Sequence, residues 1–326
     1  ENSITYAVDY ISVYLLGTIF VQIAVGLNTF ISGQGQAKIA MLSVLIGAVL
    51  NILLDPVFIF VLHMGVRGAA LATIISQAVS ALWILHFLTS QKSVIRLRLR
   101  KMRLKPSLVG KIASLGISPF IMQSTESLVS ITLNSGLQRY GGDLYVGTMS
   151  ILSSVMQLIV IPMQGVSQGV QPIISYNYGA KNGKRVKEAF FKMLAICFLG
   201  TFLLAGIAVI APEIYAGIFT SNQALVNLTC EVMPVYFLGI TIFGIQNACQ
   251  STFLALGQAK VSLFIALLRK VILLIPLAII LPKFMGVMGI YRAEPIADVI
   301  SVLITILLFT VTFKKILHNM ENRDMI

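Results

Sequence analysis

Charged residues are scarce in this chain of 326 residues. They make up 11% of it, against about 25% in an average soluble domain, while 57% of the residues are hydrophobic. A chain with so few charges is not expected to fold as a soluble domain. The composition therefore indicates a protein that lies in a membrane.

Motifs that would signal chemistry are also missing. The three cysteines, Cys197, Cys230 and Cys249, have neither metal-binding nor redox spacing. The sequence contains no P-loop, no zinc-peptidase HExxH and no hydrolase GxSxG, so direct use of ATP and an intramembrane enzyme are not indicated. We expect a protein without catalytic residues or cofactors, driven by an ion gradient if it does work.

Long apolar runs, by contrast, recur along the whole chain. Runs of about 20 residues have the length of bilayer-crossing helices, and helices satisfy the backbone hydrogen bonds that lipid cannot. The sequence predicts an all-α, polytopic membrane protein. The predicted spans are 10–31, 39–62, 67–89, 112–138, 144–176, 187–211, 228–255, 261–282 and 287–313.

The net charge of +12 is distributed unevenly between the two sides of these spans. Two connections hold most of the cations: Lys92, Arg96, Arg98, Arg100, Lys101, Arg103, Lys105 and Lys111 in one, and Lys181, Lys184, Arg185, Lys187 and Lys192 in the other. This asymmetry predicts a multi-pass protein of the plasma (inner) membrane with a cytoplasmic C-terminus. The cations would face lipid headgroups rather than nucleic acid, and we expect a monomer.

An internal repeat divides the chain. Gly35-Gln-Ala-Lys38 returns as Gly257-Gln-Ala-Lys260, and Leu16-Gly17 returns as Leu238-Gly239 at the same offset. Repeated helical halves are typical of transporters. The predicted organisation is an N-lobe of three helices (1–90), a cytoplasmic linker (91–107), a C-lobe of six helices (108–313) and a cytoplasmic tail (314–326). Because the first half matches only the last three spans of the second, we expect an N-terminally truncated piece of a protein with twelve spans.

Acidic residues inside predicted spans mark candidate sites, because a charge in hydrocarbon is costly. Asn51 and Asp55 lie four residues apart and so share a helix face, and Thr73 on the next span offers a hydroxyl. These oxygens suit Na⁺ at Asp55, and a buried Asp55 could equally carry a proton. The alternative is a set of hydrogen bonds within a helix broken at Pro56.

Three further acids are candidates for a substrate cavity. Glu294 and Asp298 form a second pair four residues apart, and Glu126 interrupts an apolar span. The pair could attract a cationic substrate or hold a proton, and the alternative is a structural ion-pair network with Arg292, or with Arg269 and Lys270. For Glu126 the alternative is a hydrogen bond to a neighbouring helix.

Two stripes follow the long span 144–176. Met149, Met156 and Met163 recur every seven residues, and Gln157 and Gln164 lie on an adjacent face. Thioethers and amides suit a roomy cavity for varied organic molecules, and Met156, Gln157 and Gln164 are the candidates for it. Contacts between helices are the alternative.

Several short stretches recur in the order of one known family. They are Gly35–Lys38, Asn51–Pro56, Gly65–Thr73, Ser118–Gln123, Tyr140–Asp143, Gln164–Pro172, Ser175–Lys181 and Glu294–Asp298. In these stretches the chain resembles the multidrug and toxic compound extrusion (MATE) transporters, nearest to their bacterial DinF-like and MepA-like members.

The resemblance implies two six-helix lobes and export of drugs in exchange for Na⁺ or H⁺. It also implies an N-lobe cation site in which Asn51, Asp55 and Thr73 match three of the family's residues, a fourth being an acid on a span expected before residue 1. Glu126 matches an acid that some members carry on span 7. We therefore predict antiport of amphipathic organic cations or drugs, with a flippase for lipid-linked saccharides as the alternative.

Overall fold

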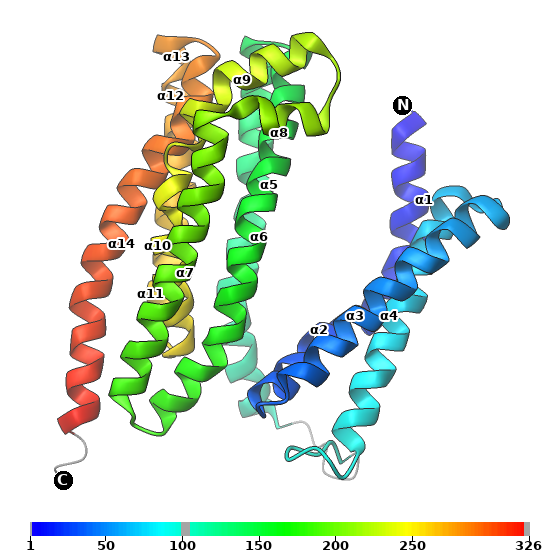
Figure 1. The fold of residues 1–326 in the computed structure, drawn as a ribbon, viewed down its shortest axis with the longest axis vertical. Coiled ribbons are helices and arrows are strands. Elements are labelled where there is room, and N and C mark those ends of the chain that lie inside the picture. Colours follow the sequence, from blue (N-terminus) through cyan, green and yellow to red (C-terminus); the bar gives the residue numbers. More distant parts are fainter. Residues whose placement is uncertain (1, 99–104, 323–326) are drawn as a thin grey trace. The chain divides into compact units, whose positions relative to one another are not determined.

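The computed structural model describes residues 2–98 and 105–322, and the regular elements in these ranges are all helical (Figure 1). The first range holds α1 (Asn2–Leu16), α2 (Thr18–Gly33), α3 (Ala37–Pro56), η1 (Val57–Val61) and α4 (Gly65–Thr89). The second holds α5 (Pro106–Tyr140), α6 (Asp143–Gly179), α7 (Gly183–Ile210), α8 (Pro212–Phe219), α9 (Gln223–Phe237), α10 (Ile240–Ala255), α11 (Ala259–Leu267), η3 (Leu268–Leu274), α12 (Ile275–Ile280), α13 (Pro282–Met285) and α14 (Met288–Asn322). The predicted all-α class is confirmed.

The number of helices suited to a bilayer differs from the prediction. Among the described residues, six helices are long and apolar enough to cross a membrane, or up to eight if the bent pairs α1–α2 and α9–α10 each count as one span. The predicted span 112–138 is helical, as part of α5, but it is not in this set. The reason is the polar run around Glu126, which lowers the mean hydropathy of α5.

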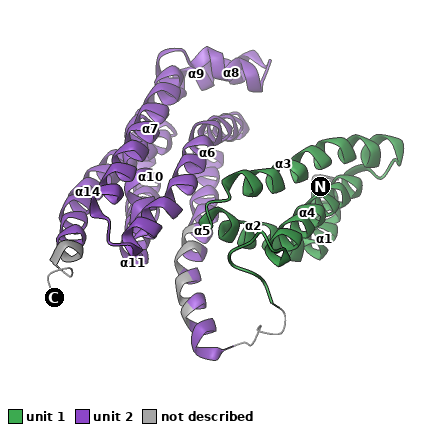
Figure 2. Ribbon diagram, turned by 60° about the horizontal axis from the view of Figure 1, so that its bottom comes forward, with its two compact units in different colours: residues 1–104 green, residues 105–326 purple. Residues whose placement is uncertain are grey.

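The chain divides into two compact units, 1–104 and 105–326, which Figure 2 shows in separate colours. The division lies inside 91–107, the segment for which the sequence predicts the connection between lobes. Of that segment, 99–104 lie outside the described residues, including Arg100, Lys101 and Arg103, and α5 already begins at Pro106. The final helix α14 continues to Asn322, beyond the predicted end of the last span. The residues 323–326 of the predicted tail lie outside the described part.

The repeated tetrapeptide has the same backbone in both units. Gly35 and Gly257 take φ of +80° and +74°, in the left-handed region that favours glycine, directly after α2 and α10. The glutamines that follow have nearly identical angles, with φ −89° and ψ 48° at Gln36 and φ −89° and ψ 50° at Gln258. Each repeat therefore ends one helix and begins the next within four residues.

The repeated Leu-Gly marks a bend in each unit. The pair α1–α2 is bent by 58° around Gly17, and α9–α10 is bent by 47° around Leu238 and Gly239. A Cβ on Gly17 would meet Ile74 of α4, and a Cβ on Gly239 would meet the Cα of Pro295 in α14 at 2.8 Å. In this part of the repeat the offset is 221, since Gly65-Val66 returns as Gly286-Val287, and it relates Ile74 to Pro295 and Thr73 to Glu294. The bend therefore packs against the same turn of the neighbouring helix in both units.

A wider π-helical stretch interrupts the corresponding span of each unit. In the first unit it is η1, which follows Pro56, and in the second it is η3, which ends just before Pro276. Proline has no N–H to donate, so one regular helical hydrogen bond is missing beside each of these stretches. Such stretches are frequent at functional sites. Both candidate groups of acids lie beside one: Asp55 directly precedes η1, and η3 contains Arg269 and Lys270.

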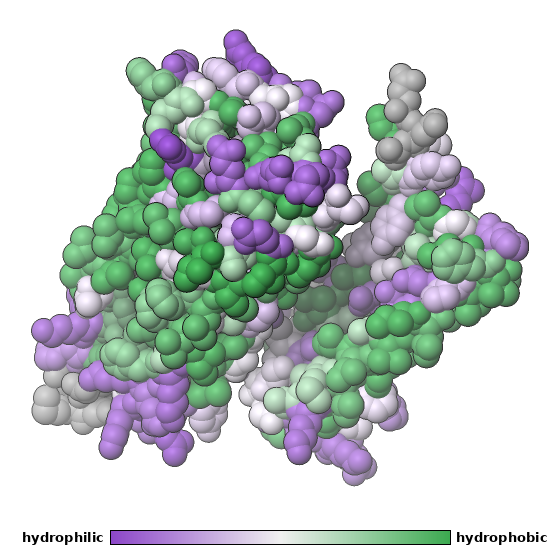
Figure 3. Space-filling view, turned by 45° about the horizontal axis from the view of Figure 1, so that its top comes forward, coloured by the Kyte–Doolittle hydropathy of each residue, from purple (hydrophilic) through white to green (hydrophobic). Residues whose placement is uncertain are grey.

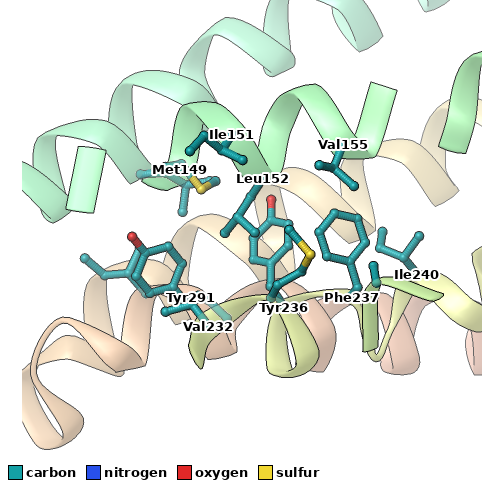
Figure 4. Close-up of a cluster of buried hydrophobic side chains, with 14 of the residues drawn as sticks. Met149, Ile151, Leu152, Val155, Val232, Tyr236, Phe237, Ile240 and Tyr291 are labelled. Carbon is teal, nitrogen blue, oxygen red and sulfur yellow. The ribbon is translucent and has the colours of Figure 1, made fainter. Parts of the chain in front are cut away.

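Apolar cores hold each unit together. In the second unit the larger core brings Met149 and Leu152 of α6 against Tyr236, Phe237 and Tyr291, as Figure 4 shows. Met149 is 6% exposed and the other four are 2% or less. The first unit has a smaller core, which contains Ile31, Ile84 and Leu88. The cores lie between helices, so the outer helix faces are left to lipid.

The outer surface has the composition expected of helix faces in contact with lipid. Large hydrophobic side chains such as Leu203, Ile210 and Leu307 are exposed. In Figure 3 hydrophobic side chains cover much of the visible helix faces, and hydrophilic ones gather toward the helix ends. A soluble protein rarely exposes apolar area on this scale, whereas a bilayer solvates it.

We expect Gly239→Ala to destabilise the protein by about 1–3 kcal/mol, because the added methyl group would collide with the Cβ of Asp298 and the backbone of Pro295, and none of these atoms is the far end of a flexible side chain. Thermal unfolding of the purified protein in detergent would show a lower midpoint. The control is Gly206→Ala, which meets nothing within 4 Å. An equal midpoint for the two variants would contradict the close packing at the bend.

Candidate functional site

The first candidate site lies within the first unit, between α3 and α4. The amide nitrogen of Asn51 donates to Oδ1 of Asp55 at 3.3 Å and to Oγ1 of Thr73 at 3.5 Å. All three side chains are half-buried. The structure therefore brings together the three residues that the sequence selected, on two helices and 22 positions apart at the widest.

Local structure explains why these side chains meet. Asn51 and Asp55 are one turn apart on α3, and the hydroxyl of Thr73 also donates to the carbonyl of Ala69 at 3.0 Å, which fixes its rotamer. The helices α3 and α4 approach closely after η1, where Gly68 leaves room for the carbonyl of Phe58, 2.8 Å from where a Cβ would stand. A bulkier residue at Gly68 would move α4 and Thr73 away.

The chemistry of this group is that of a small-cation or proton site. Asp55 supplies a carboxylate, Thr73 a hydroxyl oxygen and Asn51 an amide whose oxygen reaches the same space after a half-turn of its terminal group. Hard cations such as Na⁺ prefer such oxygens. No described residue forms an ion pair with Asp55, so its charge is available to an external cation.

The second group of acids is buried in the second unit. Arg269 of η3 donates through Nη2 to Oε1 of Glu294 at 2.8 Å and through Nε to Oδ1 of Asp298 at 2.5 Å. The side chains of Arg269, Glu294 and Asp298 are 10%, 6% and 0% exposed. The guanidinium carbon of Arg269 also lies 4.5 Å from the centre of the Phe243 ring, a favourable cation–π contact.

Glu126 has a different partner. Lys270, the neighbour of Arg269, forms an ion pair with Glu126 and so joins η3 to α5. Arg292 does not pair with either acid of α14 in the structure; it is exposed and its guanidinium contacts the sulfur of Met285 at 3.7 Å. Of the network partners that the sequence left open, the structure selects Arg269 and Lys270.

The charges of this network do not cancel. Two cations, Arg269 and Lys270, face three carboxylates, Glu126, Glu294 and Asp298, which leaves one negative charge in excess. Oδ2 of Asp298 is buried and has no hydrogen-bond partner in the described part of the chain. A buried, unsatisfied carboxylate oxygen is expensive, so the network has room for one proton.

The two stripes of α6 point in different directions. Met149 and Met163 are buried and Met156 is partly buried, and all three pack in the cores of the second unit. Gln157 and Gln164 are exposed. For the methionines this arrangement favours helix packing over a cavity, whereas the glutamines stay free to meet a ligand.

Sequence reasoning missed two polar contacts. Ser301 donates to the side-chain oxygen of the buried Gln246 at 2.9 Å, and Arg67 pairs with Asp9 at 2.8 Å. The first links α14 to α10 and the second links α4 to α1. A polar residue on each of two spans is the only sequence signal for such pairs, and it does not say which residues meet. Among the described residues no group of three His, Cys, Asp or Glu could hold a metal ion.

Comparisons with known proteins agree with this architecture. The MatE family model matches residues 119–280. The multidrug export protein MepA of Staphylococcus aureus (strain bovine RF122 / ET3-1) is 26% identical over 306 residues, which are 92% of this chain and 66% of MepA. MepA of Staphylococcus haemolyticus is 25% identical over 99% of this chain and 69% of its own length. The chain thus spans about two thirds of the length of these relatives.

Solved structures show the same fold. A MATE protein in a bent conformation superposes with a TM-score of 0.89 at 21% identity, over 98% of this chain and 72% of that protein. A MOP-superfamily transporter from Pyrococcus furiosus, whose binding pocket is described as having reversed polarity, gives 0.88 at 22% identity over 95% and 70% of the two chains.

Apolar helices, repeated halves and acids held within spans define a polytopic all-α membrane protein. The family model, the curated relatives and the shared fold then make the comparison more specific: over most of its length the chain is similar to the MATE transporters.

Removing the positive charge of Arg269 should be strongly destabilising. In Arg269→Gln, Glu294 and Asp298 would remain buried without a cation, at a cost of about 3–5 kcal/mol, and we expect a lower yield and a lower melting temperature in detergent. Arg292→Gln is the matched control, because Arg292 is exposed and pairs with no acid. Adding Glu294→Gln and Asp298→Asn to Arg269→Gln should restore part of the lost stability, because the buried acids are then neutral as well. A triple variant no more stable than the single one would contradict this account.

Proposed function

We propose that the protein is a secondary active transporter that exports amphipathic, cationic compounds in exchange for Na⁺ or H⁺. The match to the MatE family model supports this proposal, as do the MepA relatives, which are named multidrug export proteins. One observation carries the ion-coupled part of it. Of the four acids that the sequence selects, Glu126, Glu294 and Asp298 have a cationic partner, and Asp55 has none among the described residues.

The coupling step follows from that imbalance. An ionised Asp55 in low dielectric gains free energy when Na⁺ or a proton neutralises it, with Asn51 and Thr73 supplying further oxygens or hydrogen bonds. Binding that is tighter in one arrangement of the protein shifts the population toward that arrangement. A substrate that favours another arrangement is then linked to the ion, since such coupling is reciprocal.

The repeat gives the second unit a different role. Thr73 corresponds to Glu294, but there Arg269 already supplies a cation, covalently attached to the chain. The side chains of Glu294 and Asp298 are too enclosed to touch a bulky drug. We therefore propose that this pair holds a proton, and that substrate contacts come from exposed positions such as Gln157 and Gln164.

A flippase for lipid-linked saccharides is the second candidate and is not favoured. Such a protein should offer an excess of cations to the anionic lipid phosphate. Here Arg269 and Lys270 are both engaged by carboxylates, and their network is negative overall.

Asp55→Asn in the full-length protein should abolish ion-driven export while leaving membrane insertion intact. The amide has no negative charge to attract Na⁺ and does not bind a proton. Efflux of a fluorescent cation from everted vesicles, energised by a Na⁺ or a pH gradient, measures this. Asp143→Asn is the matched control, because Asp143 is exposed at the start of α6 and only accepts a hydrogen bond from Gln138. Unchanged export by Asp55→Asn would exclude the mechanism.

Thr73 should tune the affinity for the coupling ion. Thr73→Val removes one oxygen from the site and should raise the ion concentration that gives half-maximal export by about tenfold, equivalent to ~1.4 kcal/mol. Thr73→Ser keeps the hydroxyl and should stay near the starting value. The measurement is export against Na⁺ concentration and, separately, against pH. Equal behaviour of Val and Ser at this position would remove Thr73 from the site.

A further inference from the structure

A groove opens on the second unit, and none of the acids Glu126, Glu294 and Asp298 lines it. Its cavity of about 550 Å³ is lined by α7, α10 and α14. α7 and α14 both pack against α10, and the cavity lies toward the ends of these helices marked by Lys187 and Lys314. In Figure 1 this is the end of α14 next to the C-terminus.

The floor of the groove is aromatic and well packed. The ring of Phe190 stacks on that of Phe309 with centroids 4.5 Å apart, and Phe309 stacks on Phe313 at 4.7 Å. All three rings are 8% exposed or less. Ile306 and Leu194 extend the apolar lining. Such a floor offers dispersion contacts to an alkyl chain and nothing polar to a hydrophilic ligand.

The rim of the groove is cationic. Lys187 and Lys314 line it, both are exposed, and neither has an ion-pair partner among the described residues. Glu188, the acid next to Lys187 in the chain, is paired with Lys192 at 2.7 Å. The rim therefore keeps both positive charges, and an anion would complement them.

The depth of these lysines matches the headgroup level of a bilayer. Lys314 lies about 39 Å along α14 from Met288 at 1.5 Å per residue, farther than the ~30 Å of a hydrocarbon core. Lys187 lies about 6 Å from the start of α7, on the side that the charge asymmetry predicts to be cytoplasmic. The aromatic floor continues from this level toward the membrane interior.

We propose that the groove binds an anionic phospholipid of the cytoplasmic leaflet. Its phosphate lies between Lys187 and Lys314, and one acyl chain lies on the floor made by Phe190, Phe309 and Phe313. Basic pockets between spans on the cytoplasmic side suit anionic headgroups. The organic cations proposed as transported substrates would be repelled by this rim, so the groove is separate from the transport path.

Quenching of a single tryptophan by brominated lipid tests the proposal. Trp83, the one native tryptophan, is replaced by Phe, and Phe191, which lines the groove and is 60% exposed, is replaced by Trp. The full chain is placed in phosphatidylcholine nanodiscs that contain an equal small fraction of dibrominated phosphatidylglycerol or dibrominated phosphatidylcholine. We expect dibrominated phosphatidylglycerol to quench the tryptophan at a mole fraction about tenfold lower than dibrominated phosphatidylcholine needs.

Matched charge variants decide between a site and general attraction. Lys187→Gln with Lys314→Gln should remove the preference for phosphatidylglycerol. Lys184→Gln with Lys315→Gln removes the same charge from exposed positions of the same helices outside the groove lining. This double variant should keep the preference for phosphatidylglycerol. Inorganic phosphate should not relieve the quenching. Equal quenching by both lipids in the starting protein, an equal loss in both double variants, or relief by phosphate would overturn the proposal.

Discussion

A carboxylate inside a bilayer needs a positive charge beside it, and the two units of this protein meet that need differently. In the second unit the cations are part of the chain: Arg269 contacts Glu294 and Asp298, and Lys270 contacts Glu126. In the first unit Asp55 accepts a hydrogen bond from the neutral Asn51, which also bonds Thr73, and no described residue forms an ion pair with Asp55. The first arrangement fixes helices to one another, whereas in the second no cation of the described residues neutralises the carboxylate.

The two units share backbone features and differ in the side chains that these features position. The turns at Gly35 and Gly257 and the bends at Gly17 and Gly239 are alike, so both units kept the same backbone. The side chains at Thr73 and Glu294 are not alike, although the repeat places them at equivalent positions. The common scaffold thus carries a built-in cation beside the acids of the second unit and, among the described residues, none beside Asp55 in the first.

Much of the fold could be predicted from sequence because lipid allows few solutions. Apolar runs of bilayer length must be helical, and each predicted span coincides with helix in the described part of the chain. α5 is helical as predicted, but its polar centre around Glu126 makes it less apolar than the helices that have the composition of a membrane span. That centre is tolerated because Lys270 supplies the opposite charge, and no local pattern in α5 reveals a partner 144 positions away.

The sequence by itself determined the helical class, the repeat and the shared helix face of Asn51 and Asp55, since these follow from apolar runs and helix periodicity. The addition of Thr73 to that pair rested on the family resemblance, and the structure brings its hydroxyl within 3.5 Å of the Asn51 amide. Only the tertiary structure decided which cation meets which acid. Arg269, Lys270 and Arg292 were equal candidates along the chain, and packing turned Arg269 toward α14, Lys270 toward α5 and Arg292 to the surface. It also decided that the methionines of α6 fill a core, because which face of a long helix is covered depends on neighbours that are distant in sequence.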